Sequence, residues 1–207
     1  MLTVIVNTVG VVAAVTSTAL YLLDMRAGRV QPNRVSWFLW GVPPLIAAGI
    51  AWGEGARDSA ALVALFGVCP LIIVGASFFM RQARWALGSF DYACGALSVM
   101  ALAVWIGLDH PFYATLMSIG ADSCASLPTL RKSWRSPFSE SWMPYLLGGI
   151  GSACAVLEVR DPLSVEMMFP AWLLGWSLGL ALVIGFRQRI FARRGVYSQP
   201  KKDVCSS

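Results

Sequence analysis

The sequence predicts an all-α, polytopic membrane protein with seven transmembrane helices. Of its 207 residues, 57% are hydrophobic and only 13% are charged, whereas soluble domains carry roughly 25% charged residues. Long apolar runs alternate with short polar loops, and the basic residues are concentrated in every second loop. These three observations indicate a chain that lies in a lipid bilayer.

Seven apolar runs supply the expected helices, since a spanning helix needs about 20 mostly apolar residues. The first run has no basic segment before it and no Ala-x-Ala exit, so we interpret it as a spanning helix and not as a cleavable signal peptide. We therefore expect an integral protein of a bacterial inner membrane. In chain order the expected spans are 3–23, 36–53, 60–80, 90–108, 112–130, 142–157 and 163–186.

The loop charges predict the orientation of these spans. The loops near 24–35, 81–89 and 131–141, together with the tail from Arg187, hold 14 of the 16 Lys and Arg residues. Because basic loops stay on the cytoplasmic side, we expect the N-terminus outside and the C-terminus inside. The same asymmetry accounts for the net charge of +5 without a nucleic-acid partner.

An internal match at a shift of 105 residues suggests a duplicated unit. The shift relates the first three expected helices to the last three and leaves the fourth as a linker. The expected units are 1–80, a linker region 81–111, a second unit 112–187 and a basic cytoplasmic tail 188–207. Since both matching loops are basic, the two units are parallel repeats. The matched pairs are Leu22/Leu127, Arg26/Arg131, Pro32/Pro137, Ser36/Ser141, Trp37/Trp142 and Trp40/Tyr145.

The segment Ser126-Leu127-Pro128-Thr129-Leu130-Arg131-Lys132, followed by Ser141-Trp142, resembles the PQ-loop motif of the superfamily that includes the SWEET sugar transporters. Thr129 stands at the glutamine position, and Leu23-Asp24 replaces the Pro-Gln pair in the first half. The resemblance implies a 3+1+3 arrangement of helices and transport of a sugar or amino acid by alternating access. It also implies helix hinges at Pro128, at Pro144 and at Pro43 or Pro44.

A second resemblance leaves the solute open. Trp37-Phe38-Leu39-Trp40 is similar to the Trp-x-x-Trp element of bacterial nicotinamide-riboside transporters, which share the 3+1+3 arrangement. A vitamin or nucleoside transporter of this related type is therefore an alternative. A scaffold, receptor or accessory subunit that does not transport is an alternative from another class.

Polar residues at helical spacing predict where a solute would bind. The run 112–130 carries a polar stripe on one face, and a stripe within a span is expected to face the protein interior. Asp122 is the one acid deep within a predicted span, which suggests a solute-binding or proton-coupling carboxylate; a helix–helix hydrogen bond, for example to Ser17 or Ser123, is the alternative. The stripe consists of Thr115, Ser118, Asp122, Ser126 and Thr129, and the shift relates it to Gly10, Ser17, Tyr21 and Asp24, with Asn7 beyond them.

Trp172 and Trp176 lie one turn apart in the last span, beyond a bend expected at Pro170. They suit stacking on a sugar or a base, and ordinary packing is the alternative. The pattern Gly175-Trp176-Ser177-Leu178-Gly179 matches a serine-hydrolase elbow but lies within an apolar helix, so we expect no enzyme. We also expect no metal and no cofactor. The expected partners are a small solute and the lipid bilayer, and a homo-oligomer is compatible with the sequence.

Overall fold

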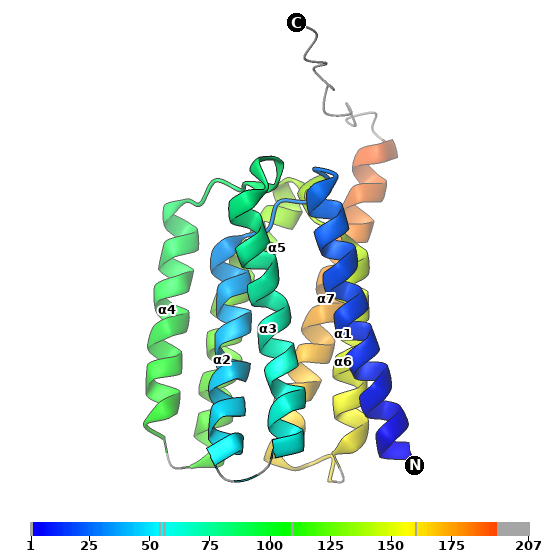
Figure 1. The fold of residues 1–207 in the computed structure, drawn as a ribbon. Coiled ribbons are helices and arrows are strands. Elements are labelled where there is room, and N and C mark those ends of the chain that lie inside the picture. Colours follow the sequence, from blue (N-terminus) through cyan, green and yellow to red (C-terminus); the bar gives the residue numbers. More distant parts are fainter. Residues whose placement is uncertain (1, 54, 56, 109, 160, 194–207) are drawn as a thin grey trace, which may run out of the picture.

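The computed structural model describes residues 2–53, 55, 57–108, 110–159 and 161–193. These residues form seven α-helices and two short 3-10 helices and contain no strand, which confirms the all-α class (Figure 1). The expected basic tail covers 188–207, and its residues 194–207 lie outside the described residues. The α-helices are α1 (Leu2–Arg26), α2 (Arg34–Gly53), α3 (Arg57–Phe79), α4 (Ser89–Ile106), α5 (Pro111–Arg135), α6 (Trp142–Glu158) and α7 (Val165–Arg193); the 3-10 helices are η1 (Arg81–Ala83) and η2 (Pro137–Ser139).

Each apolar run of the sequence coincides with one α-helix. The main difference is at the C-terminal ends of α5 and α7, which continue to Arg135 and Arg193. Both extensions are polar and end in basic residues, and a positive charge in the last turn stabilises the C-terminus of a helix. Hydropathy alone therefore places these two ends several residues too early.

Two of the described helices are long and apolar enough to cross a membrane, Val4–Arg26 within α1 and Val165–Arg193. Val63–Phe79 and Ser89–Val104 are shorter apolar segments. The helix α6 has 17 residues, slightly fewer than a typical span, and α5 contains the polar stripe. The lengths and compositions of α1 and α7 thus support a membrane protein.

Within each half of the chain, the third helix lies between the other two. In the first half α3 contacts both α1 and α2, and in the second half α7 contacts both α5 and α6. Within the described residues the backbones of α1 and α2 do not come close to each other, and neither do those of α5 and α6. The order of neighbours is therefore the same in the two halves.

Two further contacts join the halves, one between α1 and α6 and the other between α2 and α5. They close a ring of six helices in the order α1, α3, α2, α5, α7, α6. The helix α4 packs against α5 and α2 from outside this ring, and Figure 1 shows it at the edge of the bundle.

Glycines set the close approach of α2 and α3. A Cβ atom at Gly41 would lie 2.9 Å from the Gly67 carbonyl oxygen, and one at Gly67 would lie 2.8 Å from the Gly41 carbonyl oxygen. Both distances are too short for a real Cβ atom, so the backbones of the two helices meet directly. In the second half, Gly149 of α6 instead meets the side chain of Leu178 on α7.

The three basic loops and the C-terminal end of α7 lie at one end of the bundle, opposite the N-terminus of α1 (Figure 1). Hydrogen bonds join them to one another. The Gln31 backbone N–H donates to the Ser139 carbonyl (2.9 Å), and the Gln188 side-chain amide donates to the Pro137 carbonyl (3.0 Å). We refer to this end as the basic end.

Two capping side chains fix the starts of α2 and α4 at the basic end. The Asn33 side-chain oxygen accepts the backbone N–H groups of Val35 (3.1 Å) and Ser36 (3.3 Å), as a helix N-cap does. The Asn33 amide donates to Asp91 (2.7 Å), whose other oxygen accepts the Gly88 backbone N–H (2.6 Å). The buried Asn33 and Asp91 side chains thus hold the two helix starts together.

Candidate functional site

The polar stripe of α5 lies on the interior side of the helix. Ser126 and Thr129 are fully buried, and Asp122 is half-buried together with Thr115 and Ser118. On the opposite face Leu127 and Trp134 are 40% and 53% exposed. The expected orientation of the stripe therefore agrees with the burial of these residues.

Asp122 forms the centre of a hydrogen-bond network across three helices. Its Oδ2 atom accepts the indole N–H of Trp172 on α7 at 2.9 Å, and the Ser126 hydroxyl also hydrogen-bonds the carboxyl group. The Ser126 oxygen in turn accepts the indole N–H of Trp40 on α2 at 3.1 Å. The network thus runs from α7 through α5 to α2, and it contains three of the residues expected to bind solute.

The helix–helix hydrogen-bond partner of Asp122 is Trp172, and neither of the serines considered from the sequence, Ser17 and Ser123. Ser123 donates its hydroxyl to the Ile119 carbonyl (2.6 Å) of its own helix, and Ser17 donates to the Pro144 carbonyl (3.0 Å) on α6. The helix–helix hydrogen bond considered for Asp122 therefore exists, but its donor is Trp172.

The two indoles of α7 stack on each other, with ring centroids 5.6 Å apart and planes 18° from parallel. The N–H of Trp172 is used by Asp122, whereas the buried N–H of Trp176 has no hydrogen-bond partner within the described part of the chain. The hydroxyl of Thr129 is likewise buried without a partner. Unsatisfied buried donors are costly. Among the described residues Ser36, Trp37 and Ser133 also carry buried polar atoms without a partner.

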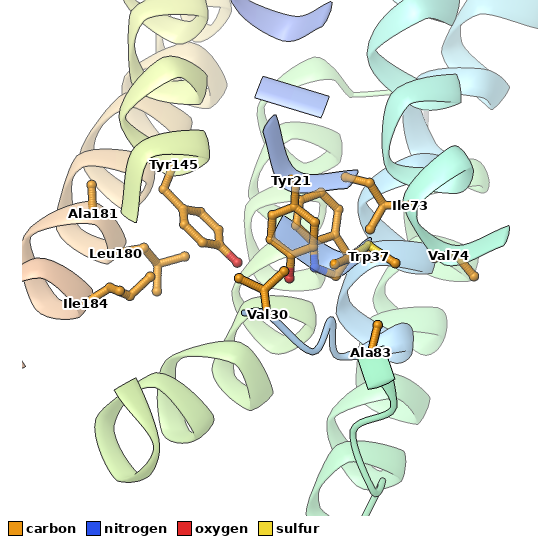
Figure 2. Close-up of a cluster of buried hydrophobic side chains, with 11 residues drawn as sticks. Tyr21, Val30, Trp37, Ile73, Val74, Ala83, Tyr145, Leu180, Ala181 and Ile184 are labelled. Carbon is orange, nitrogen blue, oxygen red and sulfur yellow. The ribbon is translucent and has the colours of Figure 1, made fainter. Parts of the chain in front are cut away.

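An aromatic cluster fills the space between the halves toward the basic end. The ring of Trp37 lies 4.6 Å from Tyr21, 5.2 Å from Trp40 and 6.4 Å from Tyr145. Figure 2 shows Tyr21 from α1 and Tyr145 from α6 entering this cluster from different helices, close to Trp37. We call these four residues the aromatic cluster.

A buried ion pair lies directly beside the aromatic cluster. The side chains of Lys132 and Glu140 form a salt bridge and are 1% and 0% exposed. Glu140 Oε2 also accepts the hydroxyl groups of Tyr21 (2.8 Å) and Tyr145 (3.2 Å). The Lys132 ammonium donates to the Gln31 carbonyl as well. Both charges are therefore compensated by an opposite charge and by further hydrogen bonds, as buried ions require.

Sequence reasoning missed this ion pair. The loop charges predict that 131–141 lies on the cytoplasmic side, and they give Glu140 no role. One signal was available, because Glu140 is the only acidic residue within that basic loop. It also lies next to Ser141-Trp142, the part of the loop that matches the first half.

Ser17 and Asn7 belong to α1 and are not part of the Asp122 network among the described residues. Ser17 belongs to the contact between α1 and α6, and the half-buried Asn7 lies near the opposite end of α1. Ser118 is half-buried one turn before Asp122. The stripe of α1 bonds to α6 through Ser17, whereas the stripe of α5 bonds to α7 and α2.

The expected hinge prolines occupy different environments. Pro128 is fully buried within α5, and Pro43 lies inside α2 beside Pro44. Pro144 lies in the first turn of α6, where a proline removes no intrahelical hydrogen bond. Its position therefore gives it no kink of the kind that an interior proline causes.

Within the described residues, no group of three His, Cys, Asp or Glu side chains could hold a metal ion. The cysteines at 69, 94, 124 and 154 are all free thiols. Around Asp122 the structure places two indoles and hydroxyl groups, which can form hydrogen bonds together with the carboxyl group. Comparison of the chain with family models, with curated proteins and with solved structures finds no match.

Proposed function

We propose that the chain is a membrane transporter that moves a small polar solute, such as a sugar, an amino acid or a nucleoside, by alternating access. In this proposal all seven helices span the bilayer, with the N-terminus outside and the basic end in the cytoplasm of a bacterial cell. The function is the one that the resemblance to the PQ-loop superfamily implies.

The observation that carries the proposal is the Asp122 carboxyl group on the interior side of α5, beside the stacked indoles of Trp172 and Trp176. A carboxyl group in the middle of a spanning helix costs at least about 2.5 kcal/mol on insertion scales. One indole N–H and one serine hydroxyl hold it. The ring of Trp176 stacks on Trp172, and its buried N–H has no partner within the described part of the chain. A solute with hydroxyl or amino groups would bond the carboxyl group and the free indole while stacking on the tryptophans.

The arrangement of helices also supports the proposal. The helices have the same order of neighbours in both halves. The 105-residue shift also relates the two contacts between the halves, α1 with α6 and α2 with α5. Parallel repeats of this kind occur in transporters that move one repeat against the other around a central site. The linker α4 lies outside the ring and leaves the two halves facing each other.

In this proposal, the aromatic cluster and the Lys132–Glu140 pair are the closed gate at the basic end. They connect α1, α2, α5 and α6 between Asp122 and the cytoplasm. Solute would reach Asp122 from the opposite end, and opening toward the cytoplasm would separate Tyr21 from Glu140.

The test is uptake by the purified protein in liposomes, over a panel of sugars, amino acids and nucleosides. Asp122→Asn removes the charge and is expected to lower uptake at least tenfold. The matched control is Glu158→Gln, because Glu158 also lies in a helix but is exposed at the end of α6; its uptake should stay within twofold of the original chain.

Two outcomes would contradict different parts of the proposal. No saturable uptake of any solute would reject transport and favour a membrane scaffold or accessory subunit. Uptake that Asp122→Asn leaves unchanged would reject only the role of Asp122. An imposed pH gradient in the same liposomes distinguishes proton-coupled transport from facilitated diffusion.

A further inference from the structure

The outer face of α5 carries a concavity that the proposed transport path does not use. It has a volume of about 460 Å³ and lies near the basic end, over α5 and the neighbouring residues of α4 and α7. Residues of α5 at steps of three and four form its floor, so they share one helix face. Its lining consists of Phe90, Leu127, Leu130, Arg131, Trp134, Arg135 and Val183.

The lining combines an apolar floor with two arginines and contains no carboxylate. Arg131 and Arg135 are exposed, and the two ion pairs among the described residues involve neither of them. The nearest acid in sequence to Phe90, Asp91, has its oxygens bonded to Asn33 and Gly88. Among the described residues no acid therefore pairs directly with Arg131 or Arg135.

Contacts within the protein hold the Arg131 guanidinium and the Trp134 indole in place. The Arg131 guanidinium stacks at 4.5 Å from the centre of the Phe90 ring, which leaves the N–H groups at its edge available to an anion. Arg187 stacks at 4.5 Å on the Trp134 ring and donates to the Trp134 carbonyl (2.8 Å). Arg187 thus fixes the wall of the concavity and adds a third positive charge beside it.

We propose that this concavity binds one anionic phospholipid of the cytoplasmic leaflet. The phosphate group would meet Arg131 and Arg135, and an acyl chain would lie along Leu127, Leu130 and Val183. A free anion would not use the apolar floor, and a zwitterionic lipid would bring a cation close to the two arginines together with its phosphate. The inference depends on the membrane placement in the proposed function but not on transport.

The test is lipid titration of the purified protein in detergent, with bound lipid counted by native mass spectrometry. The probes are dioleoyl phosphatidylglycerol and dioleoyl phosphatidylcholine, which have the same acyl chains. We expect the anionic lipid to bind at least about tenfold more tightly, because each basic residue near the membrane surface contributes measurably to anionic-lipid binding. Arg131→Gln/Arg135→Gln should remove that difference.

The matched control is Arg81→Gln/Arg84→Gln, which removes the same charge from exposed positions of the basic end outside the concavity. Equal losses in the two double variants would overturn the proposal in favour of general charge attraction. Equal affinity for the two lipids, or displacement of the bound lipid by millimolar inorganic phosphate, would overturn it as well.

A second variant covers the case in which the arginine variant does not fold. Val183→Trp fills the apolar floor without a change of charge and should lower phosphatidylglycerol binding about tenfold. Unchanged binding in this variant would overturn the proposal. Because the readout is bound lipid, a protein without transport activity can still satisfy every arm of the test.

Discussion

The contact between α1 and α6 and the contact between α2 and α5 join the same two halves with different chemistry. Tyr21 of α1 and Tyr145 of α6 share one carboxylate oxygen of Glu140. At the positions related by the 105-residue shift, Ser126 of α5 and Trp40 of α2 form one direct, uncharged hydrogen bond. One contact therefore depends on a buried charge, and the other does not.

The difference suggests a division of roles under the proposed function. The α1–α6 contact includes Glu140, which a loop supplies and which Lys132 must neutralise, so opening it exposes two charges together. The α2–α5 contact continues through Ser126 to Asp122. The first contact would close the basic end, and the second would connect the closed end with the solute site.

The largest effect is expected from Glu140→Gln. It leaves the Lys132 ammonium buried without its counter-charge, which typically costs about 3–5 kcal/mol of stability. Thermal unfolding of the purified protein, followed by tryptophan fluorescence, measures the loss. The double variant Lys132→Met/Glu140→Leu removes both charges and should recover most of it. If Glu140→Gln unfolds at the same temperature as the original chain, the buried charge does not make the α1–α6 contact energetically different from the α2–α5 contact.

Tyr21→Phe is expected to have the next largest effect. The variant keeps the ring in the aromatic cluster and removes one hydrogen bond to a charged group, worth about 1.5–3 kcal/mol. Tyr145→Phe is the control, since its bond is longer, 3.2 Å against 2.8 Å, and its loss should be smaller. Unfolding in denaturant measures both, and the reverse order would contradict the assignment of Tyr21 as the stronger donor.

Ser126→Ala is expected to have the smallest effect on stability. Uncharged hydrogen bonds between membrane helices contribute about 0.6 kcal/mol on average, and the serine is replaced by a residue of similar size. The same unfolding measurement applies. Under the proposed function, however, solute uptake should fall severalfold, because Ser126 bonds Asp122. A large loss of stability with unchanged uptake would show that this contact is structural.

The sequence predicts the helices well, because apolar runs and basic loops depend on local composition. It also predicts that the polar face of α5 lies inside, since a stripe such as Asp122–Ser126 has few alternatives in an apolar environment. It does not predict the partner of Asp122, because Trp172 lies 50 residues further along the chain and the choice of neighbour depends on the order of helices.

The sequence does not predict the Lys132–Glu140 ion pair, for a different reason. Charges in a basic loop are usually solvated, so nothing in the composition distinguishes Lys132 from Arg131 or Arg135. The structure buries Lys132 because it lies on the inner face of α5, four residues from Pro128, whereas Arg131 lies on the outer face. The helix continues through the basic loop to Arg135, beyond the end that hydropathy predicts, and this extension carries Lys132 into the interior.

The position of α1 beside α6 has a consequence for biosynthesis. Ser17 and Tyr21 find their hydrogen-bond partners 127 and 119 residues later in the chain. At a synthesis rate of about 5–20 residues per second, these polar groups wait roughly 6–25 s before their partners leave the ribosome. The first helix must therefore remain without those partners for most of translation, and only the arrival of α6 completes its surroundings.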